Sequence, residues 1–137
     1  MTRARTARRQ SAARDLLAPA VVAAGIMVAA TIPAPVPSGT PQGAGYLAHA
    51  GMYGALAATL LWTWRRRGWP NPRTNAFVIA VAYGVLHEAV QAVIPWRSAA
   101  AADVIADAAG AAAVILGDSA RRRLGFARRR PPGARAR

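Results

Sequence analysis

Five side chains that can carry charge near neutral pH, together with one side-chain amide, lie in a mostly apolar stretch between residues 82 and 110. They are His87, Glu88, Gln91, Arg97, Asp103 and Asp107. A charged group among apolar residues is costly unless another group pairs with it or a function uses it. Carboxylates and imidazoles are also the side chains that transfer protons or hold cations. We therefore expect the functional site of this chain in this stretch.

Helical spacing predicts that these side chains share faces with one another and with two residues further upstream. His49 and Tyr53 are four residues apart, as are Asp103 and Asp107. Residues at this spacing lie on one side of a helix. The segment between them has a comparable set, with spacings of three and four, made of His87, Glu88 and Gln91. Three helices are thus each expected to present a polar face.

The elements that must position these residues are predicted from four apolar segments. With 137 residues, of which 54% are hydrophobic, the chain has room for one domain and is more apolar than ordinary soluble domains. The segments cover about residues 16–32, 46–64, 75–94 and 99–117. Each is about long enough to cross the ~30 Å hydrocarbon layer as a helix. We predict an all-α polytopic membrane protein with four transmembrane helices over residues 16–117.

The positions of the arginines predict the orientation. Every basic residue is an arginine: five lie in residues 1–15, four between the second and third segments, and eight in residues 118–137. Arg97 alone falls in the turn between the third and fourth segments. Because arginines favour the cytoplasmic side, we predict both termini in the cytoplasm and the protein in the inner membrane. The net charge of +13 then reflects membrane topology and not binding to nucleic acid.

The two ends and the first segment need separate interpretation. We expect residues 1–15 to form a basic cytoplasmic arm and residues 118–137 a disordered basic tail that rests on anionic lipid. Pro19 would then lie in the first turn of the first helix. The alternative for this region is a secretory signal peptide, since a basic arm, an apolar run and small residues are its pattern.

The fourth segment is weakly apolar because it carries Asp103 and Asp107. An aspartate near the centre of a membrane helix costs roughly 2.5 to 3.5 kcal/mol. We therefore expect the earlier helices and the basic tail to hold this segment across the membrane, with both aspartates facing inward. A ridge of small residues at spacing four, which permits close helix approach, is formed by Ala102, Ala106 and Gly110.

The predicted topology also gives a depth for the polar residues. Counting about 1.5 Å per residue from the outer helix ends places the polar residues of all three helices within roughly 14 Å of the outer face. Arg97 is then the cation expected to meet Asp103 or Glu88. With three carboxylates and one arginine, the cluster requires a shared proton, a charged histidine or a bound cation.

The motifs in this region resemble those of the VanZ-like family of small polytopic membrane proteins. The similar residues are Glu88-x-x-Gln91, Pro95-x-Arg97, Asp103 and Gly110, preceded by His49-x-x-x-Tyr53. The resemblance covers about residues 30–117 and implies four transmembrane helices and, for the founding members, a part in resistance to the lipoglycopeptide teicoplanin. This chain has Gly45 and Tyr46 where the family often has Asp-Lys, and Asp107 where asparagine is common.

Several functions fit this pattern. The leading hypothesis is an outward-facing site that binds a lipid-linked envelope precursor or a lipoglycopeptide, in contact with membrane lipids. The alternatives are a buried ion-pair lock without chemistry, an intramembrane enzyme with Glu88 or Asp103 as its acid or base, and a proton-linked transporter that would require a homo-oligomer. His87-Glu88-x-x-Gln91 is similar to a zinc motif, but glutamine is a poor zinc ligand and cysteine is absent, so we expect no metal and no cofactor.

Overall fold

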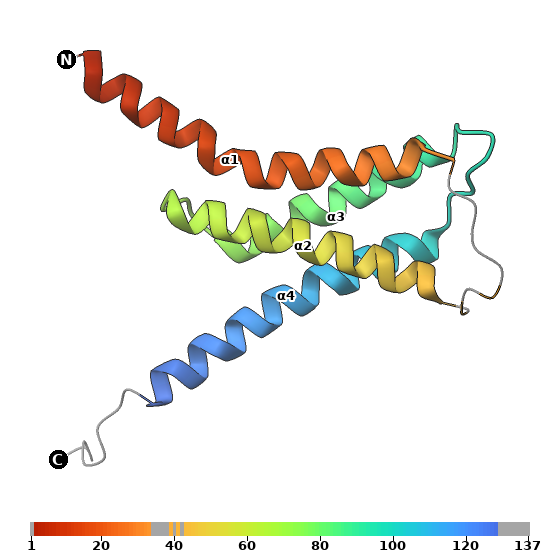
Figure 1. Cartoon of the computed structure of the whole chain (residues 1–137). Coiled ribbons are helices and arrows are strands. Elements are labelled where there is room, and N and C mark those ends of the chain that lie inside the picture. Colours follow the sequence, from red (N-terminus) through yellow and green to blue (C-terminus); the bar gives the residue numbers. More distant parts are fainter. Residues whose placement is uncertain (1, 34–38, 40, 42, 129–137) are drawn as a thin grey trace.

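The computed structural model describes residues 2–33, 39, 41 and 43–128 as four helices. They are α1 (Thr2–Thr31), α2 (Ala44–Arg66), α3 (Pro72–Gln91) and α4 (Ala101–Arg128). No strand occurs among the described residues, so the predicted all-α class is confirmed. The helices alternate in direction, and the first turn of α1 and the last turn of α4 lie at the same end (Figure 1).

Each predicted apolar segment coincides largely with a different helix, but the first and last helices are longer than predicted. α1 begins at Thr2 instead of near residue 16, and α4 continues to Arg128 instead of ending near residue 117. The sequence predicts irregular chain in both places. Arginine and alanine, which dominate there, are strong helix formers, and they let the helices continue. Residues 129–137 of the predicted tail lie outside the described residues.

The early start of α1 places Pro19 in the interior of the helix, where the sequence predicts the first turn. Proline has no backbone N–H, so the carbonyl four residues earlier, that of Asp15, loses its helical partner. The hydroxyl of Thr63, a fully buried residue of α2, donates to this carbonyl at 2.9 Å. A side chain of α2 thereby replaces the hydrogen bond that the proline removes, and α1 changes direction in this region (Figure 1).

Glycines allow α2 and α4 to cross at close range. A Cβ added at Gly110 would overlap the backbone carbonyl group of Ala50, and one added at Gly54 would lie 3.4 Å from the carbonyl oxygen of Gly110. Only a residue without a side chain fits at the first of these positions. α4 then diverges from the other helices toward its C-terminal end (Figure 1).

The core is formed by side chains from all four helices and is built mostly from small and medium-sized apolar residues. Its buried members include Ile26, Leu56, Ala57, Leu60, Leu61, Ala76 and Ala80. Many large apolar side chains on all four helices are nevertheless exposed, and Leu17, Leu47, Val85, Ile105 and Leu116 are examples. Exposed apolar surface on this scale indicates an apolar environment or a partner around the helices.

Within the part of the chain that the structure describes, one helix is long and apolar enough to cross a membrane by length and composition alone. This stretch is Ala13–Thr31 of α1, with a mean hydropathy of 1.6. It lies near the N-terminus, where a signal sequence has the same properties. Among the described helices, α2, α3 and α4 do not reach the same apolarity.

Candidate functional site

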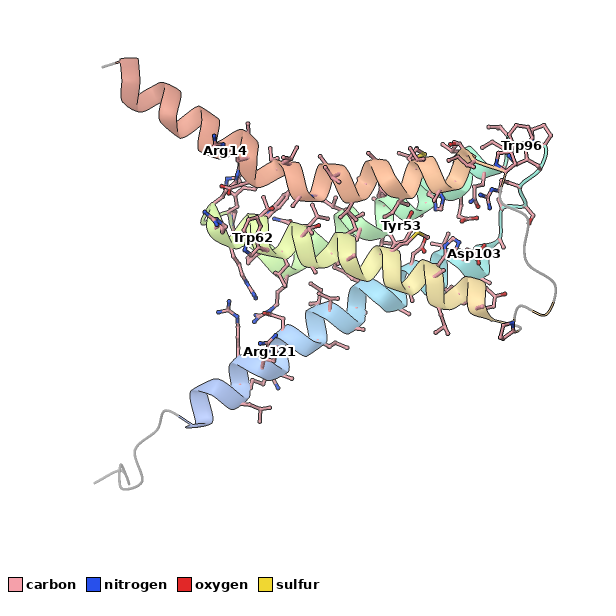
Figure 2. All side chains as sticks on the ribbon, in the orientation of Figure 1. Arg14, Tyr53, Trp62, Trp96, Asp103 and Arg121 are labelled. Atoms are coloured by element: carbon pink, nitrogen blue, oxygen red, sulfur yellow. The ribbon has the colours of Figure 1, made fainter. Side chains whose placement is uncertain are left out.

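Polar side chains from α2, α3 and α4 meet near the end of the bundle opposite the termini, where Tyr53 and Asp103 appear in Figure 2. Ligating atoms of His49, His87 and Asp107 all lie within 4.8 Å of one another, and so do those of His49, Glu88 and Asp103. His49 is common to both groups. We use the name polar cluster for His49, Tyr53, His87, Glu88, Gln91, Asp103 and Asp107.

Asp107 is the centre of this arrangement and is completely buried. Its Oδ1 lies 2.9 Å from Nδ1 of His49, and its Oδ2 has no hydrogen-bond partner. A Cβ added at Gly84 would lie 2.7 Å from that Oδ2, so the glycine makes room for the carboxylate between α3 and α4. As the sequence predicts, Asp107 faces inward, while Asp103 is half-buried.

His87 packs between the other aromatic rings of the polar cluster. Its ring stacks on that of His49, with centroids 5.6 Å apart, and lies 6.0 Å from the ring of Tyr53. Its Nε2 is 3.3 Å from the side-chain amide of Gln91. The other nitrogen, Nδ1, is buried without a partner, as is the hydroxyl of the fully buried Tyr53.

Glu88 connects α3 to the start of α4. Its Oε2 accepts a hydrogen bond from the backbone N–H of Ala100 at 2.9 Å, one of the N–H groups just before α4 begins at Ala101. A carboxylate at this place also interacts favourably with the positive end of the helix dipole. Its Oε1 is buried and has no partner, so half of the carboxylate is available for a ligand or a proton.

Arg97 does not meet the carboxylates, which corrects the sequence expectation. Its Nη2 donates to the carbonyl oxygens of Ala29 at 2.6 Å and Ile32 at 2.7 Å, at the C-terminal end of α1. These carbonyls have no partner within their own helix, and a cation is favourable there. Trp96 adds a hydrogen bond to the carbonyl of Thr31. The turn between α3 and α4 therefore caps α1, and no ion pair joins Arg97 to Glu88 or Asp103 among the described residues.

The predicted ridge of small residues is only partly at an interface. Gly110 is buried against α2, whereas Ala106 is half-buried and Ala102 is exposed. The side of α4 that faces the other helices instead carries Asp107, Gly110, Ala111 and Val114. This face runs through Asp107, Gly110, Ala111 and Val114 at spacings of three and four, and it leaves Ala102 outside the interface.

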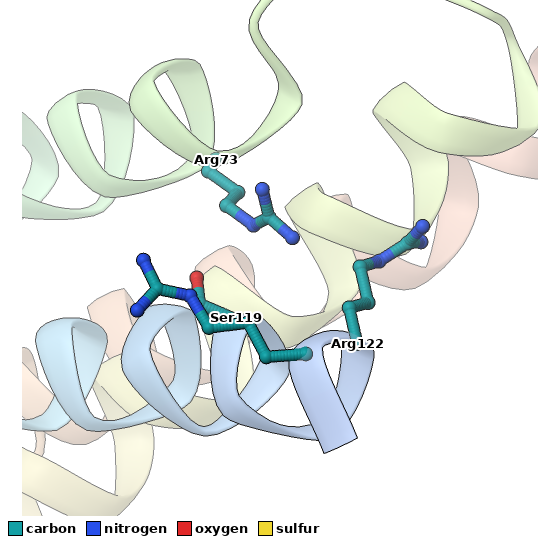
Figure 3. Close-up of a pocket in the computed structure, with 4 residues that line it drawn as sticks. Arg73, Ser119 and Arg122 are labelled. Carbon is teal, nitrogen blue, oxygen red and sulfur yellow. The ribbon is translucent and has the colours of Figure 1, made fainter. Parts of the chain in front are cut away.

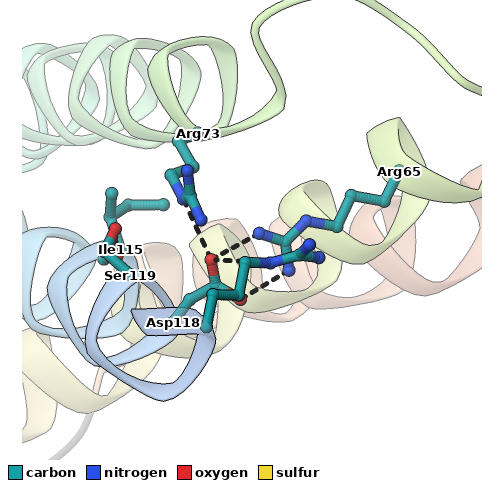
Figure 4. A network of polar contacts seen from close by, with 6 residues as sticks. Arg65, Arg73, Ile115, Asp118 and Ser119 are labelled. Atoms are coloured by element: carbon teal, nitrogen blue, oxygen red, sulfur yellow. Dashed lines mark hydrogen bonds and ion pairs between the residues drawn. The ribbon is translucent and has the colours of Figure 1, made fainter. Parts of the chain in front are cut away.

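The opposite end of the bundle is rich in arginine, and Asp118 contacts three of these arginines (Figure 4). Both of its carboxylate oxygens accept hydrogen bonds from Arg65, Oδ1 at 2.5 Å, and Nε of Arg73 donates to Oδ2 at 3.0 Å. Arg122 lies 3.7 Å from the same oxygen. The hydrogen bonds from Arg65, followed by that from Arg73, hold the pKa of Asp118 well below its usual range.

A hollow lies beside this network (Figure 3). It has a volume of about 410 Å³ and is lined by Arg73, Ser119, Arg122 and Arg123. The Ser119 hydroxyl donates to the carbonyl of Ile115 in its own helix. The arginine side chains are more exposed than those of the polar cluster, and they form a basic surface of the kind that rests on anionic headgroups.

Sequence reasoning missed several residues that hold the helices in place around the site. Gly84 and Thr63 lie on helical faces without any motif, and Asp118 was assigned to a disordered tail. Tyr83, whose hydroxyl donates to the carbonyl of Ala23 at 2.7 Å, also links α3 to α1. Asp118 had a usable signal, since it is one of only five acidic residues and lies next to a basic run.

Comparison with known proteins gave no match: no family model, no curated protein and no solved structure is similar to this chain. The resemblance to the VanZ-like family therefore stays a prediction from the motifs quoted above. The functional argument has to come from the geometry and chemistry of the polar cluster.

Proposed function

We propose that this chain is a four-helix protein of the cell envelope membrane whose polar cluster binds a polar group of a lipid-linked envelope component or a lipoglycopeptide. The observation that carries the proposal is a set of buried polar atoms without partners. They are the Tyr53 hydroxyl, Nδ1 of His87, Oε1 of Glu88 and Oδ2 of Asp107. Each such atom costs about 1 to 3 kcal/mol until a partner satisfies it. A ligand that supplies those partners recovers this free energy on binding.

The proposed membrane setting is supported by the distribution of apolar and charged side chains. Large apolar side chains are exposed along all four helices, while the arginines of α2, α3 and α4 gather at the end opposite the polar cluster (Figure 2). In the proposed topology all four helices cross the inner membrane and both termini are cytoplasmic. The polar cluster then lies in the outer half of the bilayer, where an envelope ligand has access to it.

The charges of the polar cluster suggest which part of a ligand it holds. Glu88, Asp103 and Asp107 bring acceptor oxygens, whereas Arg97 is engaged with carbonyls of α1. Acceptors that await a partner favour a ligand with hydroxyl or amino donors over a phosphate. Sugar groups of lipid-linked precursors and of lipoglycopeptides provide such donors. The resemblance to a family with members in teicoplanin resistance points in the same direction.

Two tyrosine variants test this proposal, because each removes one hydroxyl from α2. Tyr53→Phe removes a buried hydroxyl without a partner, and Tyr46→Phe removes an exposed one. We expect Tyr53→Phe to weaken retention of envelope lipid by about 2- to 12-fold, the value of one hydrogen bond of about 0.5 to 1.5 kcal/mol. Tyr46→Phe is expected to behave as wild type. Retention is measured by native mass spectrometry after incubation with total envelope lipid extract or teicoplanin.

Stability measurements separate ligand binding from a structural lock. A hydroxyl that only stabilises the fold makes Tyr53→Phe less stable without ligand. A hydroxyl that awaits a ligand makes the same variant equally or more stable, because an unsatisfied buried group is gone. Loss of stability together with unchanged lipid retention and unchanged susceptibility to envelope antibiotics would reject the proposed function.

A second candidate function, acid–base catalysis on an envelope lipid, is favoured by the contact between His49 and Asp107. A carboxylate 2.9 Å from an imidazole nitrogen orients the ring and stabilises its protonated form, as in hydrolases that use histidine as a base. Glu88 and Asp103 are the further candidates for a proton-transferring role. Turnover of labelled envelope lipid by the purified protein, abolished in Glu88→Gln or Asp107→Asn, would favour this function over binding alone.

A further inference from the structure

Both histidines of the chain lie together beside a buried carboxylate. The sequence contains only two, His49 and His87, and their ligating atoms lie within 4.8 Å of each other and of an Asp107 oxygen. The three residues come from α2, α3 and α4. His87 is 2% exposed and Asp107 is fully buried. Two imidazoles and one carboxylate at this separation form a ligand set that zinc and related ions prefer.

The unpartnered atoms of this group are lone-pair donors. Oδ2 of Asp107 and Nδ1 of His87 are buried and form no hydrogen bond. In each of the two side chains, the other atom with a lone pair already has a partner. Oδ1 of Asp107 contacts His49, and Nε2 of His87 faces the Gln91 amide at 3.3 Å. A metal ion satisfies such atoms without requiring a proton on either of them.

Nε2 of the Gln91 amide lies 3.3 Å from Nε2 of His87. Coordination of a metal through Nδ1 of His87 requires the ring proton on Nε2. A flip of the Gln91 amide, which exchanges its oxygen and nitrogen, lets the amide oxygen accept that proton. Gln91 then orients the imidazole as a positioning residue, in the way that metal-bound histidines donate their second nitrogen. The glutamine that argued against a zinc motif in the sequence is not needed as a ligand, because Asp107 provides the third position.

We propose that His49, His87 and Asp107 bind a divalent transition metal ion of the zinc type. Three protein ligands leave a fourth coordination position, which a water molecule or a ligand hydroxyl fills. The positive charge of the ion also balances the carboxylates around it, which Arg97 does not reach. The second group, in which Glu88 and Asp103 replace His87 and Asp107, offers more oxygen and suits a harder cation. Its use in place of the first group is an outcome that the experiment distinguishes.

The test is a titration of the full chain with Co²⁺ and Zn²⁺, after purification in detergent with a histidine-free tag and removal of metal with a chelator. Wild type is expected to bind about one ion per chain and to develop the visible absorption of low-symmetry Co²⁺ with nitrogen ligands. Asp107→Asn is close to isosteric, and we expect it to weaken binding by about tenfold or more. Asp15→Asn removes a carboxylate at the other end of the bundle, beside Arg66, and we expect it to bind the ion as wild type does. Loss of binding in Asp103→Asn with binding retained in Asp107→Asn would assign the ion to the second group.

Several results would overturn the assignment. They are no stoichiometric binding by wild type, undiminished binding by folded Asp107→Asn, or an equal loss in Asp15→Asn and Asp107→Asn. His87→Gln provides a second check, since it removes one of the two ring-nitrogen ligands and should weaken binding and reduce the Co²⁺ absorption. Folding is monitored by size-exclusion chromatography. Metal should also raise the melting temperature of wild type but not of Asp107→Asn.

This inference adds a metal ion to the proposed function of the polar cluster. It rests on that function for one point, namely which ligand hydroxyl fills the open coordination position. The two are nevertheless separable, because the titration contains no envelope lipid. Retention of lipid by metal-free protein with no metal binding would overturn the metal site alone. Stoichiometric metal binding by protein that retains no lipid or lipoglycopeptide would leave the metal site standing and reject the proposed function.

Discussion

At the scale of single residues, glycines and aspartates determine how closely the helices approach. Gly110 allows the backbone of α4 to touch α2 at Ala50, and Gly84 leaves space for the Asp107 carboxylate. These contacts place His49 beside Asp107. The geometry of the polar cluster thus depends on the two glycines, which have no side chain, as well as on the polar side chains themselves.

Gly110→Ala tests this dependence. The added methyl group would overlap the carbonyl of Ala50, and such overpacking typically costs about 1 to 3 kcal/mol of the free energy of unfolding. Gly117→Ala is the matched control in the same helix, because nothing lies within 4 Å of its added Cβ. We expect the control to be neutral or stabilising by up to about 1 kcal/mol. Denaturation in mixed micelles measures both, and equal stability of the two variants would contradict the close approach of α2 and α4.

Asp118 gives a prediction with a defined pH dependence. Hydrogen bonds from Arg65 and Arg73 lower its pKa in the folded state, so its stabilisation is present above the unfolded pKa of about 4 and is lost as the pH falls through the lower, folded pKa. We expect Asp118→Asn to cost about 1 to 3 kcal/mol at neutral pH. The difference from wild type should shrink when denaturation curves are measured below about pH 4.

Asp15→Asn provides the comparison for this effect. Asp15 lies 3.4 Å from Nε of Arg66, whose side chain is 58% exposed. An ion pair of this kind contributes less than about 1 kcal/mol. If Asp15→Asn lowered the free energy of unfolding as much as Asp118→Asn does, Asp118 would contribute no more stability than an exposed ion pair.

At the scale of whole elements, α1 is held by side chains from outside it at both ends of its apolar part. Thr63 of α2 satisfies the Asp15 carbonyl that Pro19 leaves free, and Arg97 caps the carbonyls at the end of the helix. We expect Thr63→Val to cost about 1 to 2 kcal/mol in wild type. In a Pro19→Ala background the cost should be smaller, because an alanine at position 19 supplies the missing N–H. A double-mutant cycle measures the coupling, and strictly additive effects would contradict it.

The elements also show how far the sequence could predict the structure. Apolar segments gave the number and approximate place of the helices, and the spacing of Asp103 and Asp107 gave the inward face of α4. The predicted partner of Arg97 was wrong because the prediction considered only carboxylates. It did not consider the free carbonyls at the end of α1. The hydrogen bond from Thr63 to Asp15 could not be predicted, because it requires α1 to begin before residue 15. Strong helix formers before residue 16 extend α1 to Thr2, ahead of the apolar segment.

At the scale of the whole molecule, two chemically different ends are separated by an apolar middle. The polar cluster lies at one end, and Asp118 with its arginines lies at the other (Figures 2 and 4). Exposed apolar side chains occupy the helices between them. This polarity agrees with the proposed topology, in which the arginines stay on the cytoplasmic side and the polar cluster lies toward the outside. In that topology, α2, α3 and α4 cross together despite their modest apolarity because they bury their polar faces against one another.

Reporter fusions test this arrangement, and the proposed topology predicts their activities without adjustment. A reporter that is active only outside should work after Ser38, whereas a reporter that is active only in the cytoplasm should work after Gly68 and after Arg137. Because α1 is the one described helix that is apolar enough to cross on its own and lies near the N-terminus, a cleaved signal sequence gives the same result after Ser38. Mass spectrometry of the mature N-terminus distinguishes the two: an uncleaved chain keeps four spans, and cleavage after α1 leaves three. Outside activity after Arg137 would reject the four-span topology, because an even number of crossings returns the chain to the side on which it began.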